Sequence, residues 1–458
     1  MDLRAQVGSI VEKIVPLVER LAQQLDGPPG TAAARLDPRE LERQCRDVGL
    51  AVGHEVFVQL LHAYGDGKQS PLRRCPCGGT RRWVGQRPRA LRDLMNREVI
   101  LERAYYFCAT CGQGWLPLDE ALGLTSAQAT PALYEVAVNC GSVAPPAEAA
   151  ELLAVVGGIQ LSAKSIERYT KAAGGAAERA VEARADAGQA DTTPDRATPA
   201  ERPFNVQLDG GMLRMDDGTF REVKVACLFD ARDALEVQPG RRELQRKHYE
   251  AHLGGPEPLG RRSYAAACAY GVMVDGANAI SQGDGAPWVW NLVQEHWPAA
   301  LEVLDYYHFS EHLHTCADAV WGAGSARAQT WAHDVGGQVL AGDATVVVQA
   351  LARLRPTTGP AQQAVADLRR YVATHQQRMH YGTLRKQGYA VASAAVESAM
   401  HGVLHRRLKR PGQRWSERGA RHILAARRLW CNRSSPADVT SLADVRHLVG
   451  PGYRRRAA

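Results

Sequence analysis

Ten cysteines occur in the chain, and four of them form two close pairs. The first pair is Cys75-Pro-Cys77 and the second is Cys108-Ala-Thr-Cys111, with a glycine after each second cysteine. Four thiolates in two such pairs can surround a tetrahedral Zn²⁺, and the glycines let backbone amides turn toward sulfur. The spacing therefore predicts a structural zinc site. Reduced buried cysteines are the alternative, because one residue instead of the commoner two separates the first pair.

Acidic residues near the ends of predicted strands form a second group of candidate ligands. Asp209 and Asp284 each follow a short strand-like run, and Glu397 opens a helical stretch far along the chain. Three carboxylates can hold two divalent ions about 4 Å apart and so support phosphoryl transfer. Hard oxygen ligands suit Mg²⁺ or Mn²⁺. Spacing alone also allows ordinary turns, because Asp-Gly recurs at Asp217 and Asp275.

Basic residues gather in two stretches that could bind phosphates. One stretch lies between the cysteine pairs and includes aromatic residues, and the other follows Glu397 with only Glu417 opposing it. A solvated charged face is the usual alternative for such runs. The candidate DNA contacts, which include two residues of a predicted helix described below, are Arg81, Arg82, Lys164, Arg168, Arg406, Arg407, Lys409, Arg410, Arg414, Trp415 and Arg418.

Length and composition indicate a soluble protein of several domains. The 458 residues correspond to about three folded units, and 45% of them are hydrophobic. The net charge of +7 fits a nucleic-acid partner. No run reaches the ~18 apolar residues of a membrane span, and the first residues do not resemble a secretory signal. We therefore expect a cytoplasmic protein with no membrane partner.

Helices are predicted throughout the first part of the chain. Apolar residues three and four positions apart between Leu3 and Leu25 predict an amphipathic helix, which either mediates dimerisation or packs on its own domain. A second helix should begin at Asp37-Pro38 and run toward Tyr64. The segments 147–156 and 162–173 resemble a helix-turn-helix, whose second helix presents Lys164 and Arg168. A helical hairpin with exposed basic residues is the alternative.

A change from helical to strand periodicity follows residue 203. An α/β sheet with strands of mixed direction is expected there, with a hairpin turn at Asp217-Gly218. The helical pattern returns from Glu311 to about Gln387. The predicted strands are 204–208, 223–229, 277–281 and 301–304, and a helix is predicted at 288–297.

Several motifs resemble one known family. The run Gly283-Asp284-Gly285-Ala286-Pro287-Trp288-Val289-Trp290-Asn291-Leu292 and the later run Leu304-Asp305-Tyr306-Tyr307-His308 resemble bacterial insertion-sequence transposases of the ISKra type. These are related to Mutator-like DDE transposases. The resemblance also covers the cysteine pairs and the segments 117–124, 209–210, 221–224, 378–379 and 396–398.

The resemblance implies an RNase H-like core whose sheet carries Asp209 and Asp284, with Glu397 returning after an all-helical insertion. It implies that these three carboxylates are catalytic and hold a two-metal site of Mg²⁺ or Mn²⁺. Asp305 and His308 match the family's Asp/Cys-x2-His signature and are secondary catalytic candidates. A histidine that only braces the strand end is the alternative for His308. The implied partners are double-stranded DNA, at transposon ends and target, and a homodimer or larger homo-oligomer.

The chain departs from the family just before Glu397. Family members usually have a glycine-rich turn there, whereas this chain has Val391-Ala392-Ser393-Ala394-Ala395. If that turn needs a positive φ, alanine should strain it or shift Glu397.

The predicted fold class is therefore α/β, with an RNase H-like core. Its predicted parts are an N-terminal helical region at 1–70, a four-cysteine zinc ribbon at 71–120, a helical region resembling a helix-turn-helix at 121–173, a linker at 174–203, the first part of the core at 204–311, the helical insertion at 312–388, and the glutamate helix with a basic C-terminal region at 389–458. The predicted function is a bacterial, nucleoid-associated DNA transposase. A non-catalytic DNA-binding derivative of a transposase and a structure-selective nuclease are the alternatives.

Overall fold

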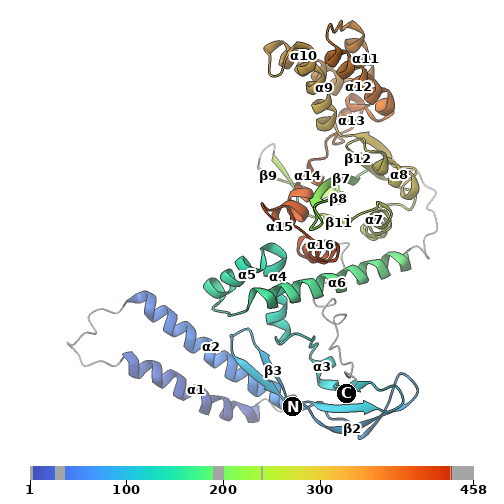
Figure 1. Ribbon diagram of the computed structural model, residues 1–458. Coiled ribbons are helices and arrows are strands. Elements are labelled where there is room, and N and C mark those ends of the chain that lie inside the picture. The colour runs from blue at the N-terminus through green and yellow to red at the C-terminus, as the bar shows by residue number, and fades with distance from the viewer. Residues whose placement is uncertain (1–3, 26–36, 189–200, 239–240, 434, 436–458) are drawn as a thin grey trace. The chain divides into compact units, whose positions relative to one another are not determined.

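The computed structural model describes residues 4–25, 37–188, 201–238, 241–433 and 435 (Figure 1). The chain forms two compact units, and the boundary lies between Ala176 and Ala177. Helices and sheets occur in both units, so the expected mixed α/β class is confirmed. Within the described ranges, no helix is both long and apolar enough to cross a membrane.

The first unit begins with the two predicted helices. α1 spans Arg4–Leu25 and contains Pro16, and α2 spans Pro38–Ala63. Asp37 caps α2, because its side chain accepts a hydrogen bond from the backbone N–H of Arg39. Dimerisation through α1 stays a prediction. Four valines of that helix are exposed, namely Val7, Val11, Val15 and Val18.

A small β-rich region follows α2 and contains the cysteine pairs. An antiparallel sheet has the order β1-β2-β5-β6, and β3 pairs with β4 in a separate hairpin. The helix α3, Pro117–Ala121, is tied to this region because buried Asp119 accepts hydrogen bonds from Arg103 at 2.9 and 2.7 Å. The strands are β1 Leu72–Arg74, β2 Thr80–Gln86, β3 Arg89–Arg92, β4 Glu98–Leu101, β5 Ala104–Cys108 and β6 Gly114–Trp115.

The remaining helices of the first unit include the helix-turn-helix candidate. α4 spans Pro131–Val143, and α5, Pro146–Leu152, continues as a π-helical turn to Gly157. The last helix, α6, runs from Ala163 to Gly188, far beyond the predicted end at residue 173. The prediction of a linker from residue 174 is therefore wrong for the part up to Gly188. The composition of residues 174–203 taken together is typical of a linker, whereas alanine, glutamate and arginine predominate in the part up to Gly188 and favour a helix there.

A five-stranded mixed sheet forms the centre of the second unit. Its order is β11-β8-β7-β12-β13, in which β7, β12 and β13 run parallel and β8 is antiparallel to both β7 and β11. The predicted hairpin is present and longer than expected. The strands are β7 Phe204–Arg214, β8 Phe220–Asp230, β11 His248–Leu253, β12 Ala279–Gly283 and β13 Leu301–Leu304.

Helices cover both faces of this sheet (Figure 1). One face packs on α7, Glu257–Tyr270, and α8, Pro287–His296, through residues such as Val206 and Leu228. The other face, which includes Val225, packs on the C-terminal helices. The alternation follows from the two-residue repeat of a strand, which sends successive side chains to opposite faces. The C-terminal helices are α14 Ala394–Ala399, a π-helical turn Met400–His405, α15 Arg406–Leu408 and α16 Glu417–Cys431.

An all-helical segment separates β13 from α14, as predicted. It begins at Tyr306, slightly earlier than expected, with Asp305 as the N-cap of its first helix. Ser325, Asp343 and Thr358 cap three of the following helices. We call this segment the insertion; its helices are α9 Tyr306–Trp321, α10 Ala326–Ala341, α11 Ala344–Arg353, α12 Gly359–His375 and α13 Tyr381–Lys386.

Two features of the second unit lie outside the sequence predictions. The hairpin of β9, Ala234–Gln238, and β10, Arg241–Leu244, is short, and three of the four residues of β10 are charged. Strand β11 is equally unusual, since it buries both His248 and Glu250. Polar residues at such positions obscure the period that identifies strands.

Candidate metal centres

The four cysteines form one compact cluster. Sγ of Cys75 lies 3.7 Å from Sγ of Cys111, and Sγ of Cys77 lies 3.7 Å from Sγ of Cys108. All four sulfurs lie within 4.8 Å of one another. A tetrahedral Zn²⁺ with bonds of about 2.3 Å separates its sulfurs by about 3.8 Å. The cluster can therefore hold a metal ion, and its dimensions suit zinc.

Glycines shape the two loops that carry these thiols. Gly78 and Gly112 have φ values of 88° and 67°, which favour glycine. Their backbone N–H groups donate to the carbonyls of Cys75 and Cys108, each at 2.9 Å. A backbone hydrogen bond from Cys111 helps to lower the pKa of Cys108 to about 6, which favours the thiolate that binds metal.

The parallel strands bring two of the predicted carboxylates side by side. Ala279 pairs with Phe204 and Gln282 pairs with Gln207, so the same register continued two residues further sets Asp284 beside Asp209. On the next strand Leu304 pairs with Gly283. Asp305 therefore continues the same row, and its backbone N–H donates to the carbonyl of Gly283 at 2.9 Å. Asp284 and Asp305 thus directly follow β12 and β13, and Asp209 lies in the same row in the middle of β7, which continues to Arg214.

The charges of Asp284, Glu397 and His308 act on Asp209. Burial, together with smaller contributions from Asp284 and Glu397, raises the pKa of Asp209 to about 6. The N–H of Gly210, which donates to Oδ1 of Asp209 at 2.7 Å, and the His308 ring act in the opposite direction. Carboxylates that repel one another are a donor set that suits a hard divalent cation.

The carboxylates are arranged more openly than the cysteines. Among the described residues, only the four cysteines bring three or more possible metal ligands within 4.8 Å of one another. Glu397 is exposed, whereas Asp209 and Asp284 are half-buried. Oδ1 of Asp284 accepts a hydrogen bond from the N–H of Ala286 at 2.9 Å, which fixes the direction of that carboxylate.

Two buried glutamines hold the turn before Glu397 against the sheet. The Gln207 amide donates to Gln282, and Oε1 of Gln207 accepts from the N–H of Val396 at 2.9 Å. Gln282 Nε2 donates to the carbonyl of Ala390 at 2.6 Å. Gln207 and Gln282 each lie two residues before an aspartate of the site, so the strands that carry the aspartates also position the glutamate. Sequence reasoning missed both glutamines, because a buried amide pair has no spacing signature.

Asp305 joins the insertion to the same turn. Its Oδ1 accepts hydrogen bonds from the N–H groups of Tyr307 and His308 at 2.6 and 3.1 Å. Its Oδ2 accepts from the N–H of Ser393 at 2.5 Å and from the Ser393 hydroxyl. With no exposed surface and four internal partners, Asp305 has a positioning role in this structure. His308 contributes to lowering the pKa of Asp209, and its Nδ1 lies 3.6 Å from Oε2 of Glu311.

The expectation of strain in the turn before Glu397 is wrong. Asn96 is the only residue other than glycine with a positive φ among those that the structure describes. Ser393, at the start of α14, has a φ of −94°. Alanine and serine therefore fit this turn without glycine. Asp305 and Gln207 hold the turn by accepting hydrogen bonds from its backbone N–H groups.

A further acidic residue lies next to the first aspartate. A Cβ atom on Gly210 would stand 2.1 Å from Oε1 of Glu222, so glycine at 210 lets that carboxylate lie against the backbone beside Asp209. The Lys224 ammonium pairs with Glu222 at 2.5 Å and lies 5.2 Å from the ring centre of Trp288. The Asp-Gly dipeptide signalled a turn, whereas the structure uses this glycine inside a strand for close approach.

The candidate DNA contacts differ widely in exposure. Arg407 is buried, with its guanidinium 5.5 Å from the ring centre of half-buried Trp415. Trp415 Nε1 donates to the carbonyl of Leu408 at 2.9 Å, and the Trp415 backbone pairs with Met215 just beyond β7. Arg81 and Arg410 are half-buried. The exposed candidates are Arg82, Lys164, Arg168, Arg406, Lys409, Arg414 and Arg418.

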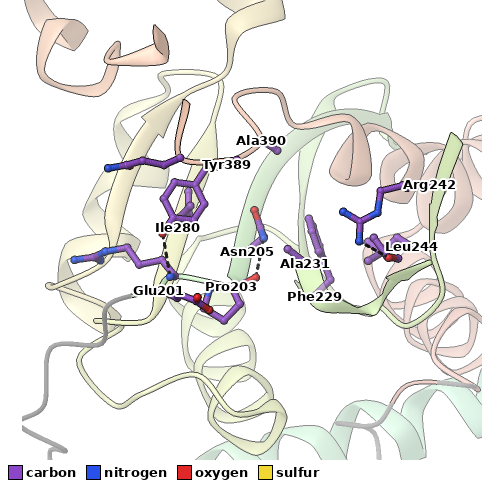
Figure 2. A pocket seen from close by; sticks show the side chains of 14 residues that line it. Glu201, Pro203, Asn205, Phe229, Ala231, Arg242, Leu244, Ile280, Tyr389 and Ala390 are labelled. Carbon is purple, nitrogen blue, oxygen red and sulfur yellow. Dashed lines mark hydrogen bonds between the residues drawn. The ribbon is translucent and has the colours of Figure 1, made fainter. Parts of the chain in front are cut away.

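A pocket of about 440 Å³ opens at the opposite end of the sheet from the aspartates (Figure 2). It is lined by residues at the start of β7, such as Asn205, and by Tyr389 on the segment that leads toward α14. Its polar groups bond to the protein itself. The Tyr389 hydroxyl accepts from the N–H of Arg202, whose side chain donates to the carbonyl of Ala299 at 2.7 Å.

Comparison with known proteins places the whole arrangement in one family. A search of curated proteins finds no match for this chain. Residues 39–437 match the profile of the uncharacterised protein family UPF0236, a range that includes the four cysteines, the aspartates and Glu397. Because this range covers most of the sequence, the chain belongs to the uncharacterised protein family UPF0236.

Proposed function

We propose that the protein is a DDE transposase of the ISKra type, related to Mutator-like transposases, that cleaves and joins DNA strands. The observation that carries the proposal is the convergence of three carboxylates on one sheet end. Asp209 and Asp284 lie on neighbouring parallel strands, and Glu397 lies close enough to raise the pKa of Asp209. Their order along the chain and their negative charges are consistent with a two-metal phosphoryl-transfer site.

The topology of the sheet supports an RNase H-like core. Numbered by their order along the chain, its strands lie in the order third, second, first, fourth, fifth. The first three form antiparallel pairs and the last two run parallel to the first. An RNase H-like sheet has this order and these directions, and its first and fourth strands are those expected to carry the two aspartates.

The chemistry follows from what the side chains can hold. Asp209, Asp284 and Glu397 would bind Mg²⁺ or Mn²⁺, which supply an activated water or 3′-hydroxyl and neutralise the leaving oxygen. The protein's part is orientation. The N–H of Gly210 fixes Asp209, the N–H of Ala286 fixes Asp284, and the two glutamines fix the turn before Glu397.

The remaining regions would bind double-stranded DNA. We propose that the cysteine cluster holds Zn²⁺ and that the ribbon and the helix-turn-helix bind transposon ends. Exposed Arg406, Lys409 and Arg414 follow the glutamate helix directly and would contact the DNA backbone near the carboxylates. A homodimer or larger homo-oligomer on the bacterial nucleoid would pair two ends.

Excision of a marked element, bounded by the gene's native flanking repeats, tests the proposal. Asp209→Ala, Asp284→Ala and Glu397→Ala should each abolish excision while DNA binding persists, because each removes a metal ligand. Asp217→Ala is the matched control, since Asp217 lies in an exposed Asp-Gly hairpin turn remote from the carboxylates. Excision retained in all three variants would reject the proposal. Binding without excision by the wild type would favour a non-catalytic derivative, and cleavage without joining would favour a nuclease.

A further inference from the structure

The insertion contacts the loop that carries Asp284. The Tyr371 hydroxyl, on α12, donates to the backbone carbonyl of Asp284 at 3.0 Å. The next residue, Gly285, has a φ of +101°, and a Cβ there would lie 3.0 Å from His375 Nε2 and 3.2 Å from the Tyr371 ring. Both the backbone conformation and the close approach of the insertion therefore require glycine at 285.

Two histidines hold the Tyr371 ring in place. The His312 ring, on α9, lies 4.1 Å from it with an interplanar angle of 31°. The His375 ring, one turn further along α12, meets Tyr371 edge-on at 4.8 Å and 60°. These two ring contacts restrict the Tyr371 side chain in the orientation in which its hydroxyl donates to the Asp284 carbonyl.

Arg378, which lies next to His375, joins the insertion to α8 and β13 of the core. Arg378 lies with its guanidinium 4.3 Å from the ring centre of Trp290 on α8. Arg378 Nε also donates to Glu302 of β13 at 2.5 Å, and its Nη1 lies 3.4 Å from His375 Nδ1. The insertion is thus fixed to the strand and the helix that surround the aspartate.

We propose that Tyr371 is a positioning residue for Asp284, through which the insertion sets the affinity of the carboxylate site for divalent metal. This inference rests on the proposed function. The Asp284 carboxylate is tied to its own loop by the Ala286 N–H, and that loop is tied to α12 by the Tyr371 hydroxyl. A ligand held in this way binds metal more tightly than one on a free loop, because less conformational entropy is lost on binding.

Tyr371→Phe tests this assignment, since it removes the hydroxyl and keeps the ring stack. The signal of free Mn²⁺ in electron paramagnetic resonance measures binding directly, and DNA strand cleavage is followed against Mn²⁺ concentration. Loss of one neutral hydrogen bond should weaken Mn²⁺ binding about three- to tenfold. The cleavage rate at saturating Mn²⁺ should return to the wild-type value, which a merely destabilised protein would not show.

Tyr264→Phe is the matched control for the hydrogen bond. Its hydroxyl donates to the carbonyl of Val274 at 3.2 Å, so the same kind of bond is lost on α7, away from the carboxylates. Gly285→Ala tests the same contact by changing the loop instead of the tyrosine, because the new Cβ should push the loop away from His375 and Tyr371. Gly412→Ala is its control, with a similar φ of +79° and no neighbour within 4 Å.

The outcomes separate this inference from the proposed function. Weaker Mn²⁺ binding in Tyr371→Phe and Gly285→Ala, with both controls at wild-type affinity, supports the inference. Unchanged binding in Tyr371→Phe, while Asp284→Asn loses it, overturns the inference and leaves the proposed function standing. If Asp284→Asn and the wild type bind Mn²⁺ equally, the carboxylate site itself is rejected.

Discussion

Asp305 shows how one buried carboxylate can position another. It accepts hydrogen bonds from the start of α9 and from Ser393, which precedes the glutamate helix. Asparagine at position 305 would place an N–H₂ group next to backbone N–H donors that need an acceptor. The residue therefore controls where Glu397 stands without touching a substrate.

We predict that Asp305→Asn destabilises the protein by about 1–3 kcal/mol and lowers strand cleavage, because buried donors are left without an acceptor. Urea unfolding and cleavage at saturating Mn²⁺ measure the two effects. Asp343→Asn is the control, since Asp343 caps α11 on the surface through the N–H of Thr345 at 2.8 Å and has no second helix to hold. An equal cost in the two variants would argue against a special role for Asp305.

His252 makes stability depend on pH. Burial, together with Arg262, Arg421 and Lys224, lowers its pKa from 6.5 to about 4, and Glu417 opposes this weakly. Between those pH values the unfolded chain binds the proton and the folded protein does not, so stability falls as pH drops from about 6.5 to about 4. The loss should be on the order of 2 kcal/mol after allowance for solvent.

Urea unfolding at pH 7 and pH 4.5 measures this loss in the wild type and in His252→Gln. The variant should lose less stability across the interval, because glutamine has no proton to gain. His333→Gln, at a histidine whose side chain is 88% exposed, should follow the wild type. Parallel curves for all three proteins would exclude His252 as the source.

At the scale of elements, the cysteine cluster joins strands that bury few side chains. β1 and β2 have no buried residue, whereas β5 buries Tyr106 and Cys108. Because two of these three strands contribute no buried side chain, the metal should contribute much of the folding free energy of this region.

Metal analysis should find one zinc per chain, and Cys108→Ser should lose it. A chelator should then abolish the protection of the β2 and β5 amides from hydrogen exchange while leaving the five-stranded sheet protected. Cys45→Ser, at an exposed cysteine outside the cluster, should retain zinc. Full protection of β5 after complete removal of zinc would contradict a structural role for the metal.

How far the sequence predicts these elements depends on their composition. The hairpin of β7 and β8 follows from apolar alternation around Asp217-Gly218, and the insertion follows from its helical period. The helix α6 is longer than predicted, because the composition of residues 174–203 taken together is typical of a linker although its first part is rich in helix-forming residues. Asp209 and Asp284 could be selected only with the family resemblance, since Asp-Gly is a common turn. The contacts of Gln207 and Tyr371 required the tertiary structure, because their partners lie far away in sequence.

At the scale of the whole molecule, the cationic residues behind the net charge of +7 differ in how much they can contribute to DNA binding. Exposed cations can release counterions from DNA, whereas a buried guanidinium cannot. We predict that Arg406→Ala with Lys409→Ala reduces the slope of log binding constant against log salt by about 1.8. Arg407→Ala should leave the slope unchanged and lower stability, because Arg407 is buried against Trp415. Fluorescence anisotropy with duplex DNA at several salt concentrations measures both, and equal slopes in the two proteins would contradict the prediction.

The two ends of the insertion meet at the sheet. The N–H of Tyr306, where the chain leaves, donates to the carbonyl of Val391, where it returns, at 3.1 Å. A segment that departs and returns at one point adds no strand and changes no register, so it can lengthen, shorten or be exchanged between relatives without rebuilding the sheet. The insertion is in this sense a separable attachment, and Tyr371 and Arg378 are two of the places where it touches the core.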